Sequence, residues 1–230
     1  MQRSKEPVAQ ANEWSRFHSD RIKGNYPRWP NEAMLKALFG SYSSRPLKPQ
    51  PGWKVLDIGC GFGNNLVPFA DLGCECHGIE IHDEISALAG EALAARGYKA
   101  EIRTGSNRAL PYEDRSFDLV LSVNTIHYEG KEALVLAALR EFRRVLRPGG
   151  LLFLSTAGPA HDIYVRAEPL EKHVYRIRNY DFRDGQEFFF FDGEEDLKSY
   201  CSREFDEVET GRVTERLFTA TVDHVIALCR

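Results

Sequence analysis

The chain has 230 residues, 43% of them hydrophobic and 28% charged, which suits one domain with a sizeable core, alone or with a small appendage. A formal net charge of -4 lacks the basic excess usual in nucleic-acid binders, so we expect no nucleic-acid partner. No apolar stretch is long enough to span a bilayer, and the start MQRSKEPVAQ has no signal-like apolar core, so we expect a cytoplasmic protein without membrane contact.

Residues 1–50 form a polar and aromatic segment that differs from the rest of the chain. A helix is predicted over residues 31–39, because the side chain of Asn31 can accept a backbone N–H of the first turn. The proline-rich stretch 45–52 then blocks regular structure. We therefore place a domain boundary near residue 50, followed by a larger domain over residues 51–230.

After this boundary, short apolar runs alternate with helical patterns. Strands are predicted over residues 54–59, 74–80, 99–105, 116–123 and 151–156. Helices are predicted over residues 64–72, 83–96 and 131–146. Strands that alternate with helices indicate an α/β fold with a mainly parallel sheet, and right-handed crossovers place helices on both of its faces.

The five cysteines favour a reducing compartment, since their odd number and irregular spacing argue against a disulfide framework. Cys74, Cys76 and His77 form a C-x-C-H sequence. Zinc sites use C-x-x-C pairs, and no second pair follows here. We therefore expect no metal site.

Three glycines alternate along VLDIGCGFG, residues 55–63, where the first strand ends. Ligands of such sheets bind beyond the carboxyl ends of the strands, and glycine lets a ligand approach the main chain. A P-loop would need a Lys-Ser/Thr pair where Asn64 and Asn65 stand, and a dinucleotide fingerprint would need its third glycine at residue 64. Asp57 would repel a pyrophosphate, so the pattern favours a cationic, amino-acid-like ligand.

Glu80 ends the second predicted strand, roughly 20 residues after the first glycine of the turn. The two oxygens of a carboxylate match the vicinal hydroxyls of a ribose. Dehydrogenases share this feature, so Glu80 predicts a nucleoside ligand without saying which one.

Four motifs carry a resemblance to a known family. They are VLDIGCGFG, GIE at residues 78–80, LPYEDRSFDLVLS at 110–122 and LREFRRVLRPGGLLFLST at 139–156. In this order they resemble the class I S-adenosylmethionine-dependent methyltransferases over about residues 50–156. The resemblance implies a Rossmann-like, doubly wound sheet of seven strands, mainly parallel with an antiparallel last strand. Its last two strands would be residues 205–213 and 224–230, joined by a connection over 214–223.

The resemblance also implies the cofactor, S-adenosyl-L-methionine, and its contacts at the methionyl end. Gly59, Cys60 and Gly61 would offer backbone groups, and Asp57 would orient this turn or approach the ammonium group. Asn124, just past the fourth strand, would face the same end.

At the nucleoside end, Glu80 would hold the ribose and Ile81 would pack against the adenine. Many relatives place an acid after the glycine that ends strand three. This chain has Ser106 and Asn107 there, and one of them would take the place of the acid.

Residues 1–50 correspond to segments that lie over the cofactor in relatives, which predicts a helical lid. Arg28 could pair with the cofactor carboxylate, and neighbouring aromatic side chains could enclose an acceptor. A helix that simply docks on the core is the equal alternative.

Methyl transfer from a sulfonium needs a nucleophile that is close, aligned and free of its proton. Strand four ends in SVNTIHY, which is not the Asn/Asp-Pro-Pro-aromatic signature of base-amine methyltransferases, and no Pro-Cys dipeptide supplies a cytosine nucleophile. His127 is the candidate general base, although a role in packing beside the cofactor or in capping a loop is the favoured interpretation.

Residues 157–193 form a variable insertion after the fifth strand. Its arginines, Arg176, Arg178 and Arg183, could contact an anionic acceptor, although a solvated face is the favoured interpretation. The run FFFF at 188–191 indicates a buried edge or an interface.

The sequence thus predicts a methyltransferase that acts on a small or medium-sized acceptor at oxygen or nitrogen. The alternative is a protein that binds S-adenosylmethionine or S-adenosylhomocysteine without catalysis, as a regulatory or assembly subunit. A nicotinamide-dependent oxidoreductase is disfavoured by Asn64 in place of the third glycine. The oligomeric state stays open.

Overall fold

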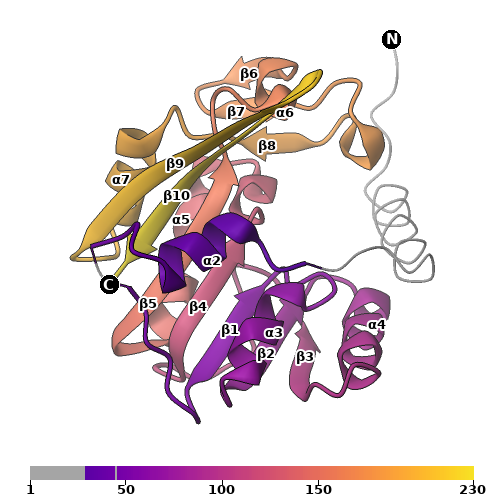
Figure 1. Ribbon diagram of the computed structural model, residues 1–230. Coiled ribbons are helices and arrows are strands. Elements are labelled where there is room, and N and C mark those ends of the chain that lie inside the picture. The colour runs from indigo at the N-terminus through magenta and orange to yellow at the C-terminus, as the bar shows by residue number, and fades with distance from the viewer. Residues whose placement is uncertain (1–28, 45) are drawn as a thin grey trace.

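The computed structural model describes residues 29–44 and 46–230, so Arg28 and residues 1–28 of the predicted lid lie outside the described residues. A seven-stranded sheet of order β3-β2-β1-β4-β5-β10-β9 forms the centre (Figure 1). Its strands are β1 Lys54–Ile58, β2 Glu75–Glu80, β3 Ala100–Thr104, β4 Phe117–Val123, β5 Leu146–Ala157, β9 Val208–Leu217 and β10 Ala220–Cys229. Within the described ranges, no helix is long and apolar enough to cross a membrane.

Helices flank this sheet, and a second sheet of order β6-β7-β8 lies above its carboxyl-terminal edge (Figure 1). The longer helices are α2 Glu32–Phe39, α3 Val67–Asp71, α4 Asp83–Ala94, α5 Glu132–Val145 and α7 Glu194–Cys201. The short ones are η1 Asn64–Leu66, η2 Ile126–Glu129, α6 Asp162–Val165 and η3 Asp181–Arg183. The small sheet comprises β6 Glu168–Glu171, β7 Val174–Arg176 and β8 Glu187–Phe189.

The pairing of the strands confirms the predicted topology. β1 pairs in parallel with β2 and β4, β2 with β3, and β4 with β5. β10 is antiparallel to both β5 and β9. The sheet is therefore mainly parallel, and the last strand of the chain runs against the others.

The predicted connection over residues 214–223 is wrong. β9 continues through Leu217 and β10 begins at Ala220, so only Phe218 and Thr219 turn the chain. The alternating, β-branched residues of this stretch extend the ladder, with Ala220 opposite Leu217. The two strands form one long hairpin at the edge of the sheet.

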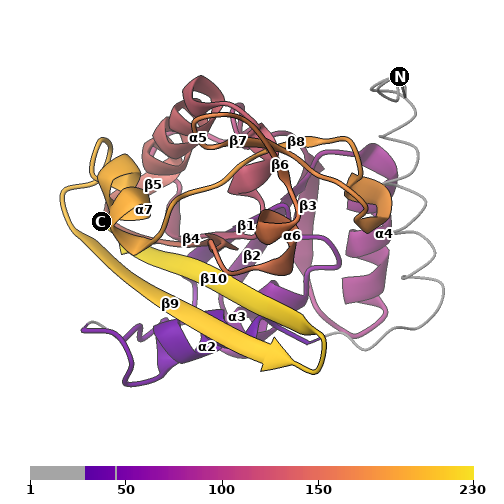
Figure 2. The ribbon, with the colours of Figure 1, turned by 90° about the horizontal axis from the view of Figure 1, so that it is seen from above.

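Two hydrophobic layers explain why helices cover both faces of the sheet (Figure 2). Along β1, Leu56 and Ile58 join the layer under α5, where Phe142 is fully buried. Val55 points to the opposite layer, which it shares with Phe69 of α3. Successive side chains of a strand point to opposite faces of the sheet. A strand whose residues are mostly apolar is therefore buried on both faces.

The N-terminus of α2 confirms the predicted cap. The side-chain oxygen of Asn31 accepts a hydrogen bond from the backbone of Met34 at 2.8 Å. The backbone N–H of Asn31 in turn donates to Asn65 at 2.9 Å. Residues 29–44 are thereby tied to the segment that follows the glycine turn of β1.

The four phenylalanines 188–191 fasten the insertion to the domain, and all four are fully buried. Phe188 and Phe190 pack into a cluster of the insertion itself. Phe189 and Phe191 point into the main core beside Tyr200. The run is a buried strand edge, which is one of the two predicted interpretations. It joins the small sheet of the insertion to the main core.

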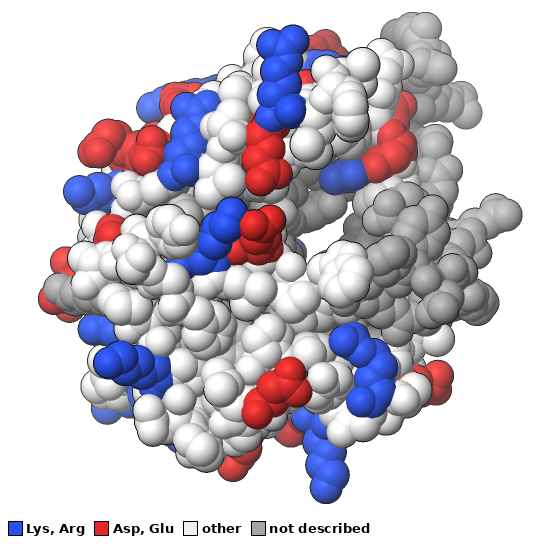
Figure 3. Space-filling model, in the orientation of Figure 1, with Lys and Arg blue, Asp and Glu red and all other residues white. Residues whose placement is uncertain are grey.

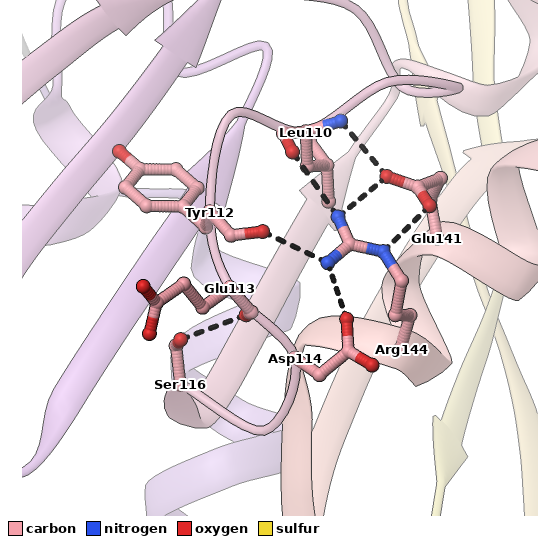
Figure 4. A network of polar contacts seen from close by, with 7 residues as sticks. All are labelled: Leu110, Tyr112, Glu113, Asp114, Ser116, Glu141 and Arg144. Carbon is pink, nitrogen blue, oxygen red and sulfur yellow. Dashed lines mark hydrogen bonds and ion pairs between the residues drawn. The ribbon is translucent and has the colours of Figure 1, made fainter.

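A network around Arg144 joins two of the motifs far apart in sequence (Figure 4). Its guanidinium holds both carboxylate oxygens of Glu141 at 2.7 and 2.8 Å. It also donates to the carbonyls of Leu110 and Tyr112 and to the carboxylate of Asp114. Glu141 accepts the backbone N–H of Leu110 at 2.9 Å. The loop between β3 and β4 is therefore fixed to α5.

Arg144→Lys should lower the free energy of unfolding by about 1–2 kcal/mol, because lysine keeps the charge but lacks the planar fork that these acceptors require. Arg140→Lys on the same helix is the control, since Arg140 is 60% exposed and lies 4.0 Å from Glu204. That change should stay within about 0.5 kcal/mol. Urea unfolding measures both variants, and equal losses would show that the network adds no stability.

Candidate functional site

A cleft of about 900 Å³ opens at the carboxyl ends of β1, β2, β3 and β4. It is visible as a hollow on the face shown in Figure 3. Most of the predicted cofactor residues line it, namely Gly59, Gly61, Glu80, Ile81, Ser106, Asn107 and Asn124. The cleft is also lined by residues that the sequence did not indicate, including Arg108, Thr125, Tyr128, Glu129 and Gln186.

The three glycines of the β1 turn all have positive φ, but they serve different purposes. A Cβ on Gly59 would lie 2.3 Å from the methyl carbon of Thr125, and one on Gly63 would lie 2.5 Å from Leu93. A Cβ on Gly61 would meet nothing within 4 Å, although Gly61 lines the cleft. Packing thus requires two of the glycines, while Gly61 leaves room for a ligand.

The N–H groups of this turn are already used inside the protein. Gly59 and Cys60 both donate to the carbonyl of Ile79, at 2.8 and 3.0 Å, and Gly61 donates to Glu80 at 2.7 Å. Phosphate-binding loops instead aim N–H groups at their ligand. The N–H groups of Gly59, Cys60 and Gly61 are therefore not available for the predicted contacts with the ligand, and the carbonyl of Cys60, which does not line the cleft, accepts the N–H of Gly63.

Asp57 is fully buried behind the turn and does not line the cleft. Burial raises the pKa of this carboxyl to about 8, and the negative charge of Glu80 adds to the shift. The side chain of Asn65 lowers the pKa in part, although no hydrogen bond of acceptable geometry joins Asp57 to a described residue. A positive ligand above the turn would satisfy this carboxylate.

Glu80 lies where the second strand meets the cleft, and it is almost completely buried. One oxygen accepts from Gly61, and the other accepts from the backbone of Ile81 at 3.2 Å. Burial raises the pKa of this carboxyl, and the two backbone donors oppose the shift. Each oxygen keeps a lone pair for one hydroxyl of a diol, so Glu80 is held ready for a ribose.

The far end of the cleft combines an apolar surface with polar groups. Ile81 is 58% exposed there, which is unusual for a side chain of its size and leaves a face for a base. Ser106 accepts the backbone N–H of Ala109, which closes a tight loop after β3. The amide of Asn107 donates to Glu129 at 2.9 Å.

Glu129 brings a carboxylate to the end of β3 from the η2 turn after β4. Arg108 donates to it at 2.8 Å, and only 9% of the Glu129 side chain is exposed. Burial raises the pKa of this carboxyl, while Arg108 and Asn107 lower it. No local sequence signal indicates this placement, because it depends on how η2 packs beside the neighbouring strand.

Asn124 holds a left-handed backbone conformation, φ 57°, at the end of β4. Asparagine tolerates this region better than most residues, and such conformations concentrate at binding sites. Its backbone N–H donates to Ser155 at 2.9 Å, which fixes the turn to β5. Asn124 lines the cleft beside the glycine turn, as predicted.

His127 is buried and is not part of the cleft wall. Its Nδ1 bonds the hydroxyl of Thr156 at 3.0 Å, and its ring stacks on Phe188 at 4.8 Å. Burial lowers the pKa of His127 to about 3, and the positive charge of Arg183 adds to the effect. The ring is neutral at physiological pH, and its surroundings favour the packing alternative.

Beyond Tyr128, polar side chains of the insertion and of β10 face one another. The rings of His161 and His224 are 5.6 Å apart. The Nδ1 atom of His161 accepts a backbone N–H at 3.1 Å, so the proton of the neutral ring lies on Nε2. Arg183 pairs with Asp181, and its carbonyl accepts from Gln186 of the cleft wall. The sequence singled out Arg183 alone among these groups.

The other two arginines of the insertion form local ion pairs. Arg176 lies 3.1 Å from Glu187, and Arg178 contacts Glu168. All four side chains are substantially exposed. These pairs agree with the solvated face that the sequence favoured.

Comparison with known proteins finds similarity over the part of the chain that contains the four motifs. Residues 56–154 match a family model described as a methyltransferase domain. The ubiquinone biosynthesis O-methyltransferase of Roseobacter denitrificans is 30% identical over 141 residues, which is 60% of this chain and 56% of that protein. The chain spans about half the length of the curated relatives it matches.

Solved structures share the fold. A SAM-dependent methyltransferase from Methanosarcina mazei superposes with a TM-score of 0.64 at 23% identity, covering 79% of this chain and 94% of that one. Phosphoethanolamine N-methyltransferase 2 of Haemonchus contortus, solved with S-adenosylhomocysteine, has a TM-score of 0.66 at 18% identity. It covers 96% of this chain and 58% of that one.

The chain's own residues fit the cofactor of these proteins. Asp57 suits an ammonium group, Glu80 suits a ribose, and Ile81 suits a base. The strand order, the motifs and the matched domain agree with this fit. The chain therefore contains a methyltransferase domain over residues 56–154, its fold is that of solved SAM-dependent methyltransferases, and its residues fit S-adenosylmethionine as the cofactor.

Proposed function

We propose that the protein transfers the methyl group of S-adenosylmethionine to a small or medium-sized acceptor, at an oxygen or a nitrogen atom. The observation that carries the proposal is the pair His161 and His224, close to Arg183, beyond the methionyl end of the cleft. In the described structure no hydrogen bond joins the His224 ring to another residue. Partly buried titratable groups gathered next to a cleft are typical of a substrate site.

The same groups favour an enzyme over the alternative of a non-catalytic binding subunit. A protein that only holds the cofactor needs the glycine turn, Glu80 and Ile81. Polar groups placed beyond Tyr128 serve a second molecule. Relatives named as an O-methyltransferase and as N-methyltransferases are compatible with either atom as the acceptor, and a further relative is named as a sterol 4-C-methyltransferase.

The surface supports a small acceptor. Among the described residues on the face shown in Figure 3, basic and acidic side chains are interspersed and form no continuous basic patch. Nucleic-acid sites depend on such patches for affinity. One relative is named as a probable tRNA methyltransferase, but the charge pattern here lacks the corresponding footprint.

Positioning supplies most of the catalysis in this proposal. The cofactor contributes an electrophilic methyl group on a sulfonium. The turn at Gly59–Gly61 and Asn124 orient the methionyl end, and the insertion holds the acceptor in line with it. His127 shapes the wall behind Tyr128, since a buried ring with a pKa of about 3 is a weak base.

The purified protein should convert S-adenosylmethionine to S-adenosylhomocysteine when a metabolite extract of small molecules is added. Mass spectrometry measures the product and the gain of one methyl group by the acceptor. The protein alone and the extract alone serve as controls. Tight cofactor binding with no turnover on any fraction would favour the non-catalytic alternative, and binding of a nicotinamide dinucleotide instead would contradict both.

Gly61→Ala should weaken S-adenosylhomocysteine binding roughly tenfold, or about 1.4 kcal/mol, because the new methyl group occupies the cleft. Its backbone conformation should cost about 1 kcal/mol of stability. Gly59→Ala is the contrasting variant and should lose about 2–4 kcal/mol, since its methyl group also collides with Thr125. Calorimetry and urea unfolding separate the two effects. Unchanged affinity in Gly61→Ala would place the ligand elsewhere.

Binding of the cofactor near Asp57 should release up to one proton at about pH 6.5, where both a carboxyl of pKa about 8 and the ligand's amino group are protonated. The nearby ammonium favours the ionised carboxylate, so it lowers the pKa of Asp57 from above the pH of the experiment to below it. Calorimetry in buffers of different ionisation enthalpy counts the proton. Asp57→Asn should release none, and a wild-type value of zero would separate Asp57 from the ammonium.

A further inference from the structure

We propose that Glu129 recognises the adenine base of the cofactor by accepting a hydrogen bond from its exocyclic amino group. The inference rests on binding of S-adenosylmethionine in the 900 Å³ cleft. It assigns a specificity-determining role to a residue for which neither the motifs nor the strand ends provide a signal.

The cleft leaves one region for the base. The glycine turn and Asn124 occupy the β1–β4 end, and Glu80 takes the ribose at the end of β2. The wall next to Glu80 contains Ile81 and residues 105–108 at the end of β3, and Glu129 is bonded to two of these residues, Asn107 and Arg108. A base stacked on Ile81 therefore presents its edge to this polar group.

The edge of adenine needs an acceptor there. Its amino group is a hydrogen-bond donor, and a buried donor without a partner costs about 1–3 kcal/mol. Glu80 and Glu129 are the two acids among the described residues that line the cleft. Since Glu80 serves the ribose, Glu129 is the carboxylate available to the base.

Two donors hold the carboxylate of Glu129 in place and leave part of its hydrogen-bonding capacity unused. Asn107 donates to Oε1 at 2.9 Å, and Arg108 donates to Oε2 at 2.8 Å. A carboxylate has about four lone-pair positions, so each oxygen keeps one for a further donor. Both donors lie in the loop that follows Gly105. They therefore hold the carboxylate of Glu129 at the end of β3, where the loop itself has Ser106 and no acid.

If the ion pair between Arg108 and Glu129 served stability alone, Glu129 would not need to be buried in the cleft. The Arg108 side chain is 45% exposed, whereas Glu129 is 9% exposed. Exposed pairs contribute little, and burying a carboxylate costs free energy that an exposed pair would avoid. A buried acid in a ligand cleft, supported by two donors, is better explained by the ligand.

The test compares two ligands by calorimetry. S-adenosylhomocysteine carries the amino group, and S-inosylhomocysteine carries a carbonyl oxygen at the same position. The wild type should bind the first at least tenfold more tightly, because the carbonyl would face the carboxylate. In Glu129→Gln the amide can accept or donate, so this preference should fall at least fivefold.

Two further variants separate the explanations. Glu132→Gln makes the same change in an acid that is 53% exposed and pairs with Arg203 outside the cleft, and it should keep the wild-type preference. Arg108→Met removes the ion pair but keeps the carboxylate, so it should also discriminate against S-inosylhomocysteine. Thermal unfolding confirms that each variant is folded.

An unchanged preference in folded Glu129→Gln would overturn the proposal. A loss of preference in Arg108→Met equal to that in Glu129→Gln would also overturn it, since the ion pair would then be the cause. If the wild type bound neither ligand, the cofactor assignment itself would fail, and that result is distinct from the other two.

Discussion

The contact between the ends of β1 and β4 is the constraint on which the site depends. Gly59 lies so close to Thr125 that no side chain fits between them, and its N–H is bonded to Ile79 of β2. The ends of three adjacent strands therefore meet at Gly59. Gly61, two residues later, lines the cleft and has open space where a side chain would stand.

This arrangement decides which nucleotide chemistry the α/β sheet supports. Where a turn aims free N–H groups at its ligand, the ligand is an anion such as a pyrophosphate. Here the N–H groups are bonded to Ile79 and Glu80, and the buried Asp57 lies behind them. Both features disfavour negative charge and favour an ammonium or a sulfonium. The cation preference inferred from one acid in the sequence therefore has a backbone basis as well.

Features set by short stretches of sequence were predictable, and features set by packing were not. The glycine turn, Glu80 and the cap at Asn31 follow from neighbouring residues. The structure confirms the cap, and it places Gly59, Gly61 and Glu80 in the wall of one cleft. Glu129 was missed because its role depends on η2 meeting the end of β3. The hairpin over residues 214–223 was missed because these residues pair only with one another, beyond the part of β10 that pairs with β5. His161, at the start of α6, and His224 of β10 come together through a packing that the sequence leaves open.

The architecture explains why the residues around the cofactor were predictable from the sequence and those around the proposed acceptor were not. Cofactor contacts come from strand ends, whose positions are fixed by the register of a sheet buried on both faces. The groups that we propose to face the acceptor come from β10 and from the insertion. The insertion is joined to the domain by Phe189 and Phe191, while Phe188 and Phe190 build its own core. Substitutions on the inner surface of the insertion can therefore alter acceptor binding without moving the strand ends. A fold built in this way conserves one ligand and leaves the other free to change, which is why the sequence indicates the cofactor so clearly and the acceptor so little.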